Sequence, residues 1–263
     1  MRHLLGVYII WYRDLLRFWH DRMRLFGSVS MPLLFLFVFG SGLGSRIGNL
    51  GAGVNYISFM FPGIIGMTVL MSSFMAGVSV VWDREFGFLK EVLVAPVSRV
   101  AVSIGKTLGS ATVSLIQGII ILLLAPLLGI SLSLPTVLAL LGVMFLLAAT
   151  MGSFGVLLAT RIRSMEAFQA LMQMLLFPMV FLSGAFFPLQ GLPPWMNVIV
   201  KLNPATYGIA PLREVMLGTG QGNPFAITLF GYTLSLWTNI LVLALFCIIM
   251  VLMAMWSFSN QRN

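Results

Sequence analysis

The segment VVWDREFGFLKEVLVAPVSRV, residues 80–100, decides the architecture of this chain because it concentrates charge between two apolar runs. The stretch from Asp83 to Arg99 carries six charges, whereas the whole chain of 263 residues has only 15 basic and 7 acidic residues. Each Asp, Lys or Arg at the centre of a bilayer costs about 2.5–3.5 kcal/mol, and each Leu, Val or Phe returns only about 0.3–0.6 kcal/mol. The segment therefore lies in water, with a membrane span on either side.

The composition as a whole indicates a polytopic all-α membrane protein. Hydrophobic residues make up 59% of the chain, charged residues 8%, and the mean hydropathy is +1.03, whereas soluble domains carry about 25% charged residues. Several windows of 18 or more residues have no charge, as expected of spanning helices. The net charge of +8 is attributed to loops on the inner side of the membrane rather than to nucleic-acid binding.

Six membrane spans are predicted, each with about 20 residues or more, which is enough for a hydrocarbon core of about 30 Å at about 1.5 Å per residue. Pro178 interrupts the fifth span and is expected to kink it. The spans cover about Leu25–Gly44, Ser58–Trp82, Thr107–Leu128, Pro135–Thr160, Ala167–Phe187 and Leu236–Ser257.

The distribution of cations predicts the orientation of these spans. With the N-terminus in the cytoplasm, the inner segments hold twelve of the Lys and Arg residues, and the outer segments keep only Arg46, Lys201 and Arg213. Because basic residues accumulate on the cytoplasmic side, both termini are expected to be cytoplasmic.

The first 24 residues predict an interfacial helix on the membrane surface. At helical spacing Arg13, Arg17, Asp21 and Arg24 line one side, while aromatic residues such as Trp11 gather on the other. Aromatic anchors opposite a charged face are typical of helices that lie in the plane of the interface. A partly disordered basic tail is the alternative.

The segment 188–217, between the fifth and sixth spans, is rich in proline yet too apolar for a solvated loop. Prolines at such intervals permit only short helices. We expect two short re-entrant helices in the outer leaflet, around WMNVIVKL and TYGIAPLREVM, covered by the rest of the protein.

The sequence disfavours three kinds of chemistry within the chain. Gly105-Lys106-Thr107 resembles the end of a P-loop, but the required earlier glycine is replaced by Val100, so no ATP site is expected. Ser183 has no histidine base within the spans, and one Cys with two His makes no zinc cluster. The spans have no ionisable residue at mid-depth, where ion-coupled carriers usually carry one, and their strongest polar groups include Gln117 and Asn239.

Three motifs resemble those of the membrane subunits of ABC-2 type exporters, a family that includes daunorubicin-type drug efflux permeases, Nod-factor exporters and polysaccharide exporters. FMFPGIIGM, residues 59–67, is similar to the start of the second span in that family. REFGFLKEVLVAPVSR, residues 84–99, resembles its cytoplasmic segment, and FLSGAFFPLQGLPPWMNVIVKLNPATYGIAPLR, residues 181–213, resembles the signature before its last span.

The resemblance implies a single transmembrane domain, residues 1–263, that works as half of a transporter. It implies two identical membrane subunits with two separate ATPase subunits, which bind ATP and magnesium, so that this chain needs no cofactor. Residues 83–106 would form the coupling segment, whose helix inserts into a groove of the ATPase; the alternative is a plain solvated loop. The expected docking residues are Asp83, Arg84, Glu85, Phe86, Gly87, Leu89, Lys90 and Glu91.

The expected cargo is an amphipathic drug-like or lipidic compound that is exported from the cell across the inner membrane of a prokaryote. Phe61, Phe181, Phe186 and Tyr207 are the residues expected to line or gate its path. Export of a lipid-linked glycan is the alternative within transport. A membrane anchor or sensor for a partner protein is the alternative from another class.

Overall fold

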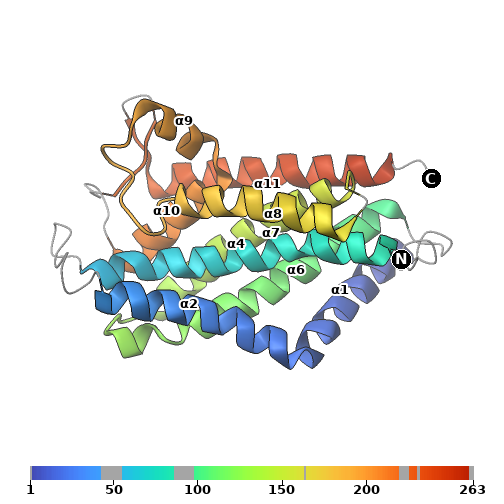
Figure 1. Ribbon diagram of the computed structural model, residues 1–263, viewed down its shortest axis with the longest axis horizontal. Coiled ribbons are helices and arrows are strands. Elements are labelled where there is room, and N and C mark those ends of the chain that lie inside the picture. Colours follow the sequence, from blue (N-terminus) through green and yellow to red (C-terminus); the bar gives the residue numbers. More distant parts are fainter. Residues whose placement is uncertain are drawn as a thin grey trace.

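The computed structural model describes residues 2–42, 55–85, 98–162, 164–218, 225–229 and 232–260, and these form a bundle of helices that run mostly along one axis (Figure 1). The two strands are short and pair in an antiparallel hairpin just before the last helix. The elements are α1 (Arg2–His20), α2 (Arg22–Gly42), α4 (Tyr56–Glu85), α6 (Arg99–Leu122), the 3-10 helix η1 (Ala125–Leu128), α7 (Leu134–Ala159), α8 (Met165–Phe181), α9 (Pro194–Leu202), α10 (Pro204–Leu217), β1 (Thr228–Leu229), β2 (Tyr232–Thr233) and α11 (Leu236–Ser259).

Four helices in the described part of the chain are long and apolar enough to cross a membrane. They are α4, α6 together with η1, α7 and α11. Helices α2 and α8 hold shorter apolar stretches, Val29–Gly40 and Met165–Phe181. The all-helical class and four of the six predicted spans are thus confirmed, and the first and fifth spans stay predictions.

Serine side chains fix where several of the helices begin. Ser98, Ser133, Ser164 and Ser235 are the N-caps of α6, α7, α8 and α11, and each hydroxyl accepts a hydrogen bond from a backbone N–H in the first turn. Such a cap satisfies a donor that the helix itself leaves unpaired. The cap at Ser98 starts α6 eight residues before the predicted span at Thr107, so the first two turns of α6 include Arg99, Ser103 and Lys106.

Helix α4 occupies the centre of the bundle and packs against α2, α6, α7, α8 and α10. Glycines in its first half allow other segments to approach closely. A Cβ atom on Gly63 would collide with the backbone of Ala185, and one on Gly66 would collide with the side chain of Ile209 in α10. The motif FMFPGIIGM therefore provides the surface on which α10 and the segment after α8 rest.

Helix α8 ends at Phe181, before the predicted end of the fifth span at Phe187. The chain turns there through Gly184, whose φ of 79° favours glycine. The Ser183 hydroxyl donates to the Val180 carbonyl at the same turn. Pro178 lies inside α8, as predicted.

A buried arginine joins α10 to α4 and to the turn after α8. The Arg213 guanidinium donates to the carbonyl oxygens of Phe59 at 3.2 Å, Gly184 at 2.6 Å and Ala185 at 3.4 Å. It also lies 3.8 Å from the centre of the Phe59 ring, close enough for a cation–π interaction. Carbonyl oxygens rather than a carboxylate therefore stabilise this charge in the described structure.

The ends of the helices define the two ends of the bundle. Helix α1 begins and α11 ends at the same end of the molecule (Figure 1). Helix α4 ends and α6 begins at that end as well (Figure 1). The residues that flank the charged segment are thus gathered with both chain ends.

Replacing Arg213 is expected to destabilise the fold. Arg213→Met keeps much of the side-chain volume but leaves three carbonyl groups without their donor, and each such loss costs about 1–3 kcal/mol. We expect the unfolding midpoint in detergent to fall by about 5 °C or more. Arg161→Met, at an exposed position, is the control, and equal midpoints for the two variants would contradict the role assigned to Arg213.

Candidate functional site

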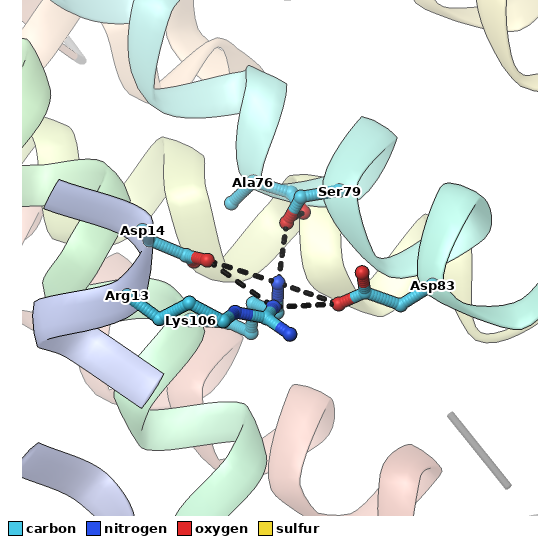
Figure 2. A network of polar contacts seen from close by, with 6 residues as sticks. All are labelled: Arg13, Asp14, Ala76, Ser79, Asp83 and Lys106. Carbon is cyan, nitrogen blue, oxygen red and sulfur yellow. Dashed lines mark hydrogen bonds and ion pairs between the residues drawn. The ribbon is translucent and has the colours of Figure 1, made fainter. Parts of the chain in front are cut away.

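Four charged side chains from three helices meet at the end of the bundle where α4 ends (Figure 2). Arg13 and Asp14 come from α1, Asp83 from the last turn of α4, and Lys106 from the second turn of α6. We call these four residues the charge cluster. Since α4 and α6 flank the charged segment 86–97, the cluster lies at the base of that segment.

Lys106 is the centre of the charge cluster. Its Nζ lies 2.8 Å from Asp83 Oδ2 and 3.3 Å from Asp14 Oδ1, and it donates to the Ser79 hydroxyl at 3.0 Å. The Ser79 hydroxyl in turn donates to the carbonyl of Ala76 (Figure 2). The three donors of the ammonium group are thereby all used.

Arg13 lies on the more exposed side of the charge cluster. Its Nη2 lies 2.8 Å from Asp83 Oδ2 and 3.3 Å from Asp14 Oδ1. Burial lowers the pKa of Arg13, but the hydrogen bonds and charges of Asp83 and Asp14 outweigh it and raise the pKa overall. The guanidinium therefore stays charged, and the cluster contains two cations and two carboxylates.

Because the side chains of the charge cluster are largely buried, its positive and negative charges have to balance. The side chain of Lys106 is 2% exposed and that of Asp83 is 10% exposed. Removing one partner of a buried ion pair costs about 3–5 kcal/mol, because it leaves a charge without compensation. The cluster thus holds α1, α4 and α6 together only while its charges remain paired.

Helix α1 packs along α6, and it approaches most closely at two glycines of α6. A Cβ on Gly105 would lie 2.9 Å from Ile10 Cβ, and one on Gly109 would lie 3.1 Å from Asp14 Cβ. The Trp11 indole donates to the Thr112 hydroxyl at 2.9 Å. These two glycines therefore allow α1 to approach α6 closely.

The orientation of α1 differs from the one predicted. Its charged side, with Arg13 and Asp14, turns toward the bundle, because Lys106 and Asp83 offer partners there. The exposed side is apolar at helical spacing: Leu5, Tyr8, Ile9, Tyr12, Leu16 and Trp19. This helix is amphipathic, as predicted, but its hydrophobic stripe faces outward.

The predicted docking residues divide into described and undescribed ones. Asp83 is engaged inside the chain by Lys106 and Arg13, so this carboxylate serves the cluster. Arg84 donates to the Ile162 carbonyl at 2.9 Å, and Glu85 is exposed. The remaining predicted docking residues, Phe86, Gly87, Leu89, Lys90 and Glu91, lie outside the described residues.

The predicted path residues are only partly brought together. The rings of Phe181 and Phe186 lie 5.3 Å apart, and Phe186 also contacts Phe35 and Phe39 of α2. Phe61 is fully buried in α4. Tyr207 stacks on Phe246 of α11, and its hydroxyl donates to the Lys201 carbonyl at 2.8 Å. Their role in a path stays a prediction.

Lys106, Arg13 and Asp14 were not among the residues that the sequence predicted for a site. Lys106 was interpreted as the flank of the third span, and Arg13 as part of a surface face. One signal was available: Asp83 at the end of one apolar run and Lys106 at the start of the next are opposite charges that a short connection brings together. No cluster of metal-ligating side chains occurs within the described ranges.

The fold and its cluster define a class: a helical membrane protein whose charged groups join three helices at one end of the bundle. Residues 6–217 match the ABC-2 type transporter family. The chain belongs to this family, which confirms the resemblance noted in the sequence.

Relatives in several organisms carry names of transport permeases. The chain is 34% identical to the transport permease ycf38 of Cyanophora paradoxa, over 73% of this chain and 67% of that protein. It is 29% identical to the inner membrane transport permease YadH of Escherichia coli K12, over 83% of this chain and 86% of that protein. Nodulation protein J of Rhizobium meliloti is 27% identical, over 73% of this chain and 74% of that protein.

The charge cluster predicts a specific pattern of mutant stability. Lys106→Met and Asp83→Asn should each destabilise the protein, because each leaves an unbalanced buried charge. The double variant keeps Arg13 and Asp14 as a balanced pair and should lose less than the sum of the two single losses, by about 0.5–3 kcal/mol. The measurement is the unfolding midpoint in detergent, with the exposed Glu85→Gln as control. Strict additivity would show that the residues do not act together.

Proposed function

We propose that the chain is the membrane-spanning permease subunit of an ATP-driven ABC exporter. Membership of the ABC-2 type transporter family and the transport permeases among its relatives support a role in transport. The finer statement, that transport is outward and driven by a separate ATPase, rests on the charged segment between α4 and α6.

The observation that carries this proposal is the way the charge cluster holds the base of that segment. Helix α4 ends at Glu85 and α6 begins at Arg99, and the pair Asp83–Lys106 links these two helices just inside the bundle. A partner that moves the segment would therefore move α4, α6 and α1 as one unit. Such a connection suits the transmission of an ATPase movement to the spans.

The proposed assembly has two copies of this chain and two ABC ATPase subunits. ATP and magnesium would bind to the ATPase, and no cofactor is expected in this chain. The assembly would lie in the inner membrane of a prokaryote, and the name of the relative YadH agrees with this location. The bilayer is the only other partner expected, without nucleic acid.

The proposed topology has six spans with both termini in the cytoplasm, and α2 and α8 would be the first and fifth spans. The placement of the start of α1 and the end of α11 at one end of the bundle requires an even number of crossings, which supports this count (Figure 1). Helices α9 and α10 would then lie at the outer end, within the outer leaflet.

The proposed cargo is an amphipathic drug-like or lipidic compound. A lipid-linked glycan is the second candidate, as the resemblance to Nod-factor and polysaccharide exporters implies. A membrane anchor or sensor without transport activity is disfavoured by the family, although an anchor would need the same spans.

The topology predicts which cysteines an impermeant thiol reagent can reach in intact cells. With Cys247 replaced by Ser, Ser131→Cys, at an exposed position between η1 and α7, should label from outside. Asn260→Cys, exposed after α11, should label only after the membrane is permeabilised. The opposite pattern would overturn the proposed orientation.

The docking segment predicts a difference between apolar and charged residues. Gly87→Leu and Leu89→Ala should release the proposed ABC ATPase partner, because truncating or blocking a buried anchor commonly costs about 2 kcal/mol or more. Glu91→Lys should give a milder, salt-sensitive loss, since charges at the rim act mainly on association rate.

The measurement is co-purification with the ATPase in detergent, alongside cargo-stimulated ATP hydrolysis. Ser131→Ala, at the opposite end of the bundle, serves as the control. If Gly87→Leu and Leu89→Ala both kept full assembly and full coupling, the segment would be an ordinary loop.

A further inference from the structure

A cavity of about 440 Å³ lies between α2, α4, α6 and α8. Its volume falls within the range of small-molecule sites, about 300–1,000 Å³. None of its described lining residues is charged. Five methionines contribute to the wall: Met31, Met67, Met71, Met75 and Met172. Methionine side chains are flexible and polarisable, so such a wall adapts to apolar molecules of varied shape.

Two buried polar atoms in this wall have no hydrogen-bond partner. They are Oε1 of Gln117, a side chain that is only 2% exposed, and Oγ of Ser72. Among the described residues just one other buried side-chain atom, Asn239 Oδ1 on α11, is left in this state. An unpaired buried polar group costs about 1–3 kcal/mol, and native structures contain few of them.

A neighbouring hydroxyl does have a hydrogen-bond partner, so among the described residues of this wall the lack of partners is confined to Gln117 and Ser72. Thr68, in the same wall, donates to the carbonyl of Ile64 at 2.8 Å. The Gln117 carbonyl oxygen accepts no hydrogen bond from the described residues, so an N–H or O–H group of a ligand could satisfy it. An apolar cavity with an unused acceptor fits a ligand of complementary chemistry.

We propose that this cavity binds an uncharged, largely apolar small molecule through an N–H or O–H group that donates to Gln117 and lies beside Ser72. This inference rests on the proposed function, because it makes the cavity the cargo site of the permease. The absence of charged groups among its described lining residues disfavours an ionic ligand. A glycan fits poorly, since most of its hydroxyl groups would meet methionine and lose their hydrogen bonds to water.

A second cavity connects this site to the charge cluster. It has a volume of about 220 Å³, is lined by Asp14, Arg17 and Ser79, and shares Ser72 and Met75 with the first. Ser72, Met75 and Ser79 follow one face of α4 at helical spacing. A ligand at Gln117 therefore contacts the same helix face that the charge cluster holds at its end.

The test uses two photoreactive probes that differ in one hydrogen-bond donor, para-hydroxymethyl benzophenone and its methyl ether. On irradiation the ketone abstracts a hydrogen atom from a nearby C–H bond, and the two radicals join in a new C–C bond. The purified chain in lipid nanodiscs, without ATPase or ATP, is irradiated with each probe. Mass spectrometry of the peptides then locates the label.

The hydroxymethyl probe should label the cavity methionines at a concentration about tenfold lower than the ether does, because only the alcohol donates to Gln117. Gln117→Leu should abolish this difference. Asn239→Leu is the matched control, since it removes another buried amide with an unpaired oxygen outside the cavity, and it should keep the difference. If Gln117→Leu does not fold, Ser72→Ala should reduce the difference instead.

A second pair of variants tests the location of the site. Gly27 lines the cavity, and a Cβ on it meets no atom within 4 Å, so Gly27→Leu should narrow the cavity without a clash and reduce labelling by both probes. Gly142 on α7 also has open space around it and lies outside the cavity lining, and Gly142→Leu should leave labelling unchanged.

Three results would overturn the proposal. The first is equal labelling by the two probes in the unmodified chain. The second is labelling of the exposed Met174 and Met253 in place of the cavity methionines. The third is an unlabelled cavity together with a dimer that Gly27→Leu dissociates, which would assign the surface to a second copy of the chain. Assembly with the ATPase is measured separately, so failure of the cargo site and failure of the proposed function are distinguishable.

Discussion

The ion pair between Lys106 and Asp83 is the interaction on which one end of this bundle depends, the end where α4 ends and α6 begins. It joins the end of α4 to the beginning of α6, and Arg13 and Asp14 extend it to α1. Three helices thus meet at one point where two positive and two negative charges balance. Because these contacts lie where α4 ends and α6 begins, the positions of these two helix ends and of α1 are coupled.

At the other end of α4, a buried cation is stabilised by a different set of partners. Arg213 is buried there, and backbone carbonyls around Phe59 and Gly184 replace the carboxylates that surround Lys106. The contacts of Lys106 join helices to one another, whereas those of Arg213 join α10 to a turn whose shape depends on Gly184. Helix α4 is therefore fixed at both ends by cations, while its middle carries the glycines and methionines that shape packing and cavity.

Much of the fold follows from local sequence properties. The long apolar runs predict α4, α7 and α11, and the prolines between residues 188 and 211 predict the two short helices α9 and α10. The end of α8 was missed because the turn at Gly184 and Ala185 depends on contacts with Arg213 and Gly63, which are distant in sequence. The start of α6 was missed because Ser98 caps a helix whose first two turns include the charged residues Arg99 and Lys106.

The site was harder to predict than the fold, for a physical reason. A lysine beside an apolar run has two favourable environments, the lipid headgroups and a buried carboxylate, and composition alone does not distinguish them. The choice depends on the rotation of α1, which places Asp14 against Gly109 of α6. The same rotation turns the apolar side of α1 outward. Gln117 was visible as a polar residue in a span, but its unpaired oxygen is apparent only once the surrounding side chains are placed.

The position of the charge cluster also has a consequence for how the chain is made. Asp83 lies in the last turn of α4 and Lys106 in the second turn of α6. With this end of the bundle in the cytoplasm, as proposed above, neither charge has to cross the hydrocarbon core when its helix enters the bilayer during synthesis. Helix α4 is translated first, so the Asp83 carboxylate remains in the aqueous interface until α6 has been synthesised. The Asp83–Lys106 ion pair then forms after both helices have been inserted. Burial of these charges is thus a late step of assembly and does not oppose insertion.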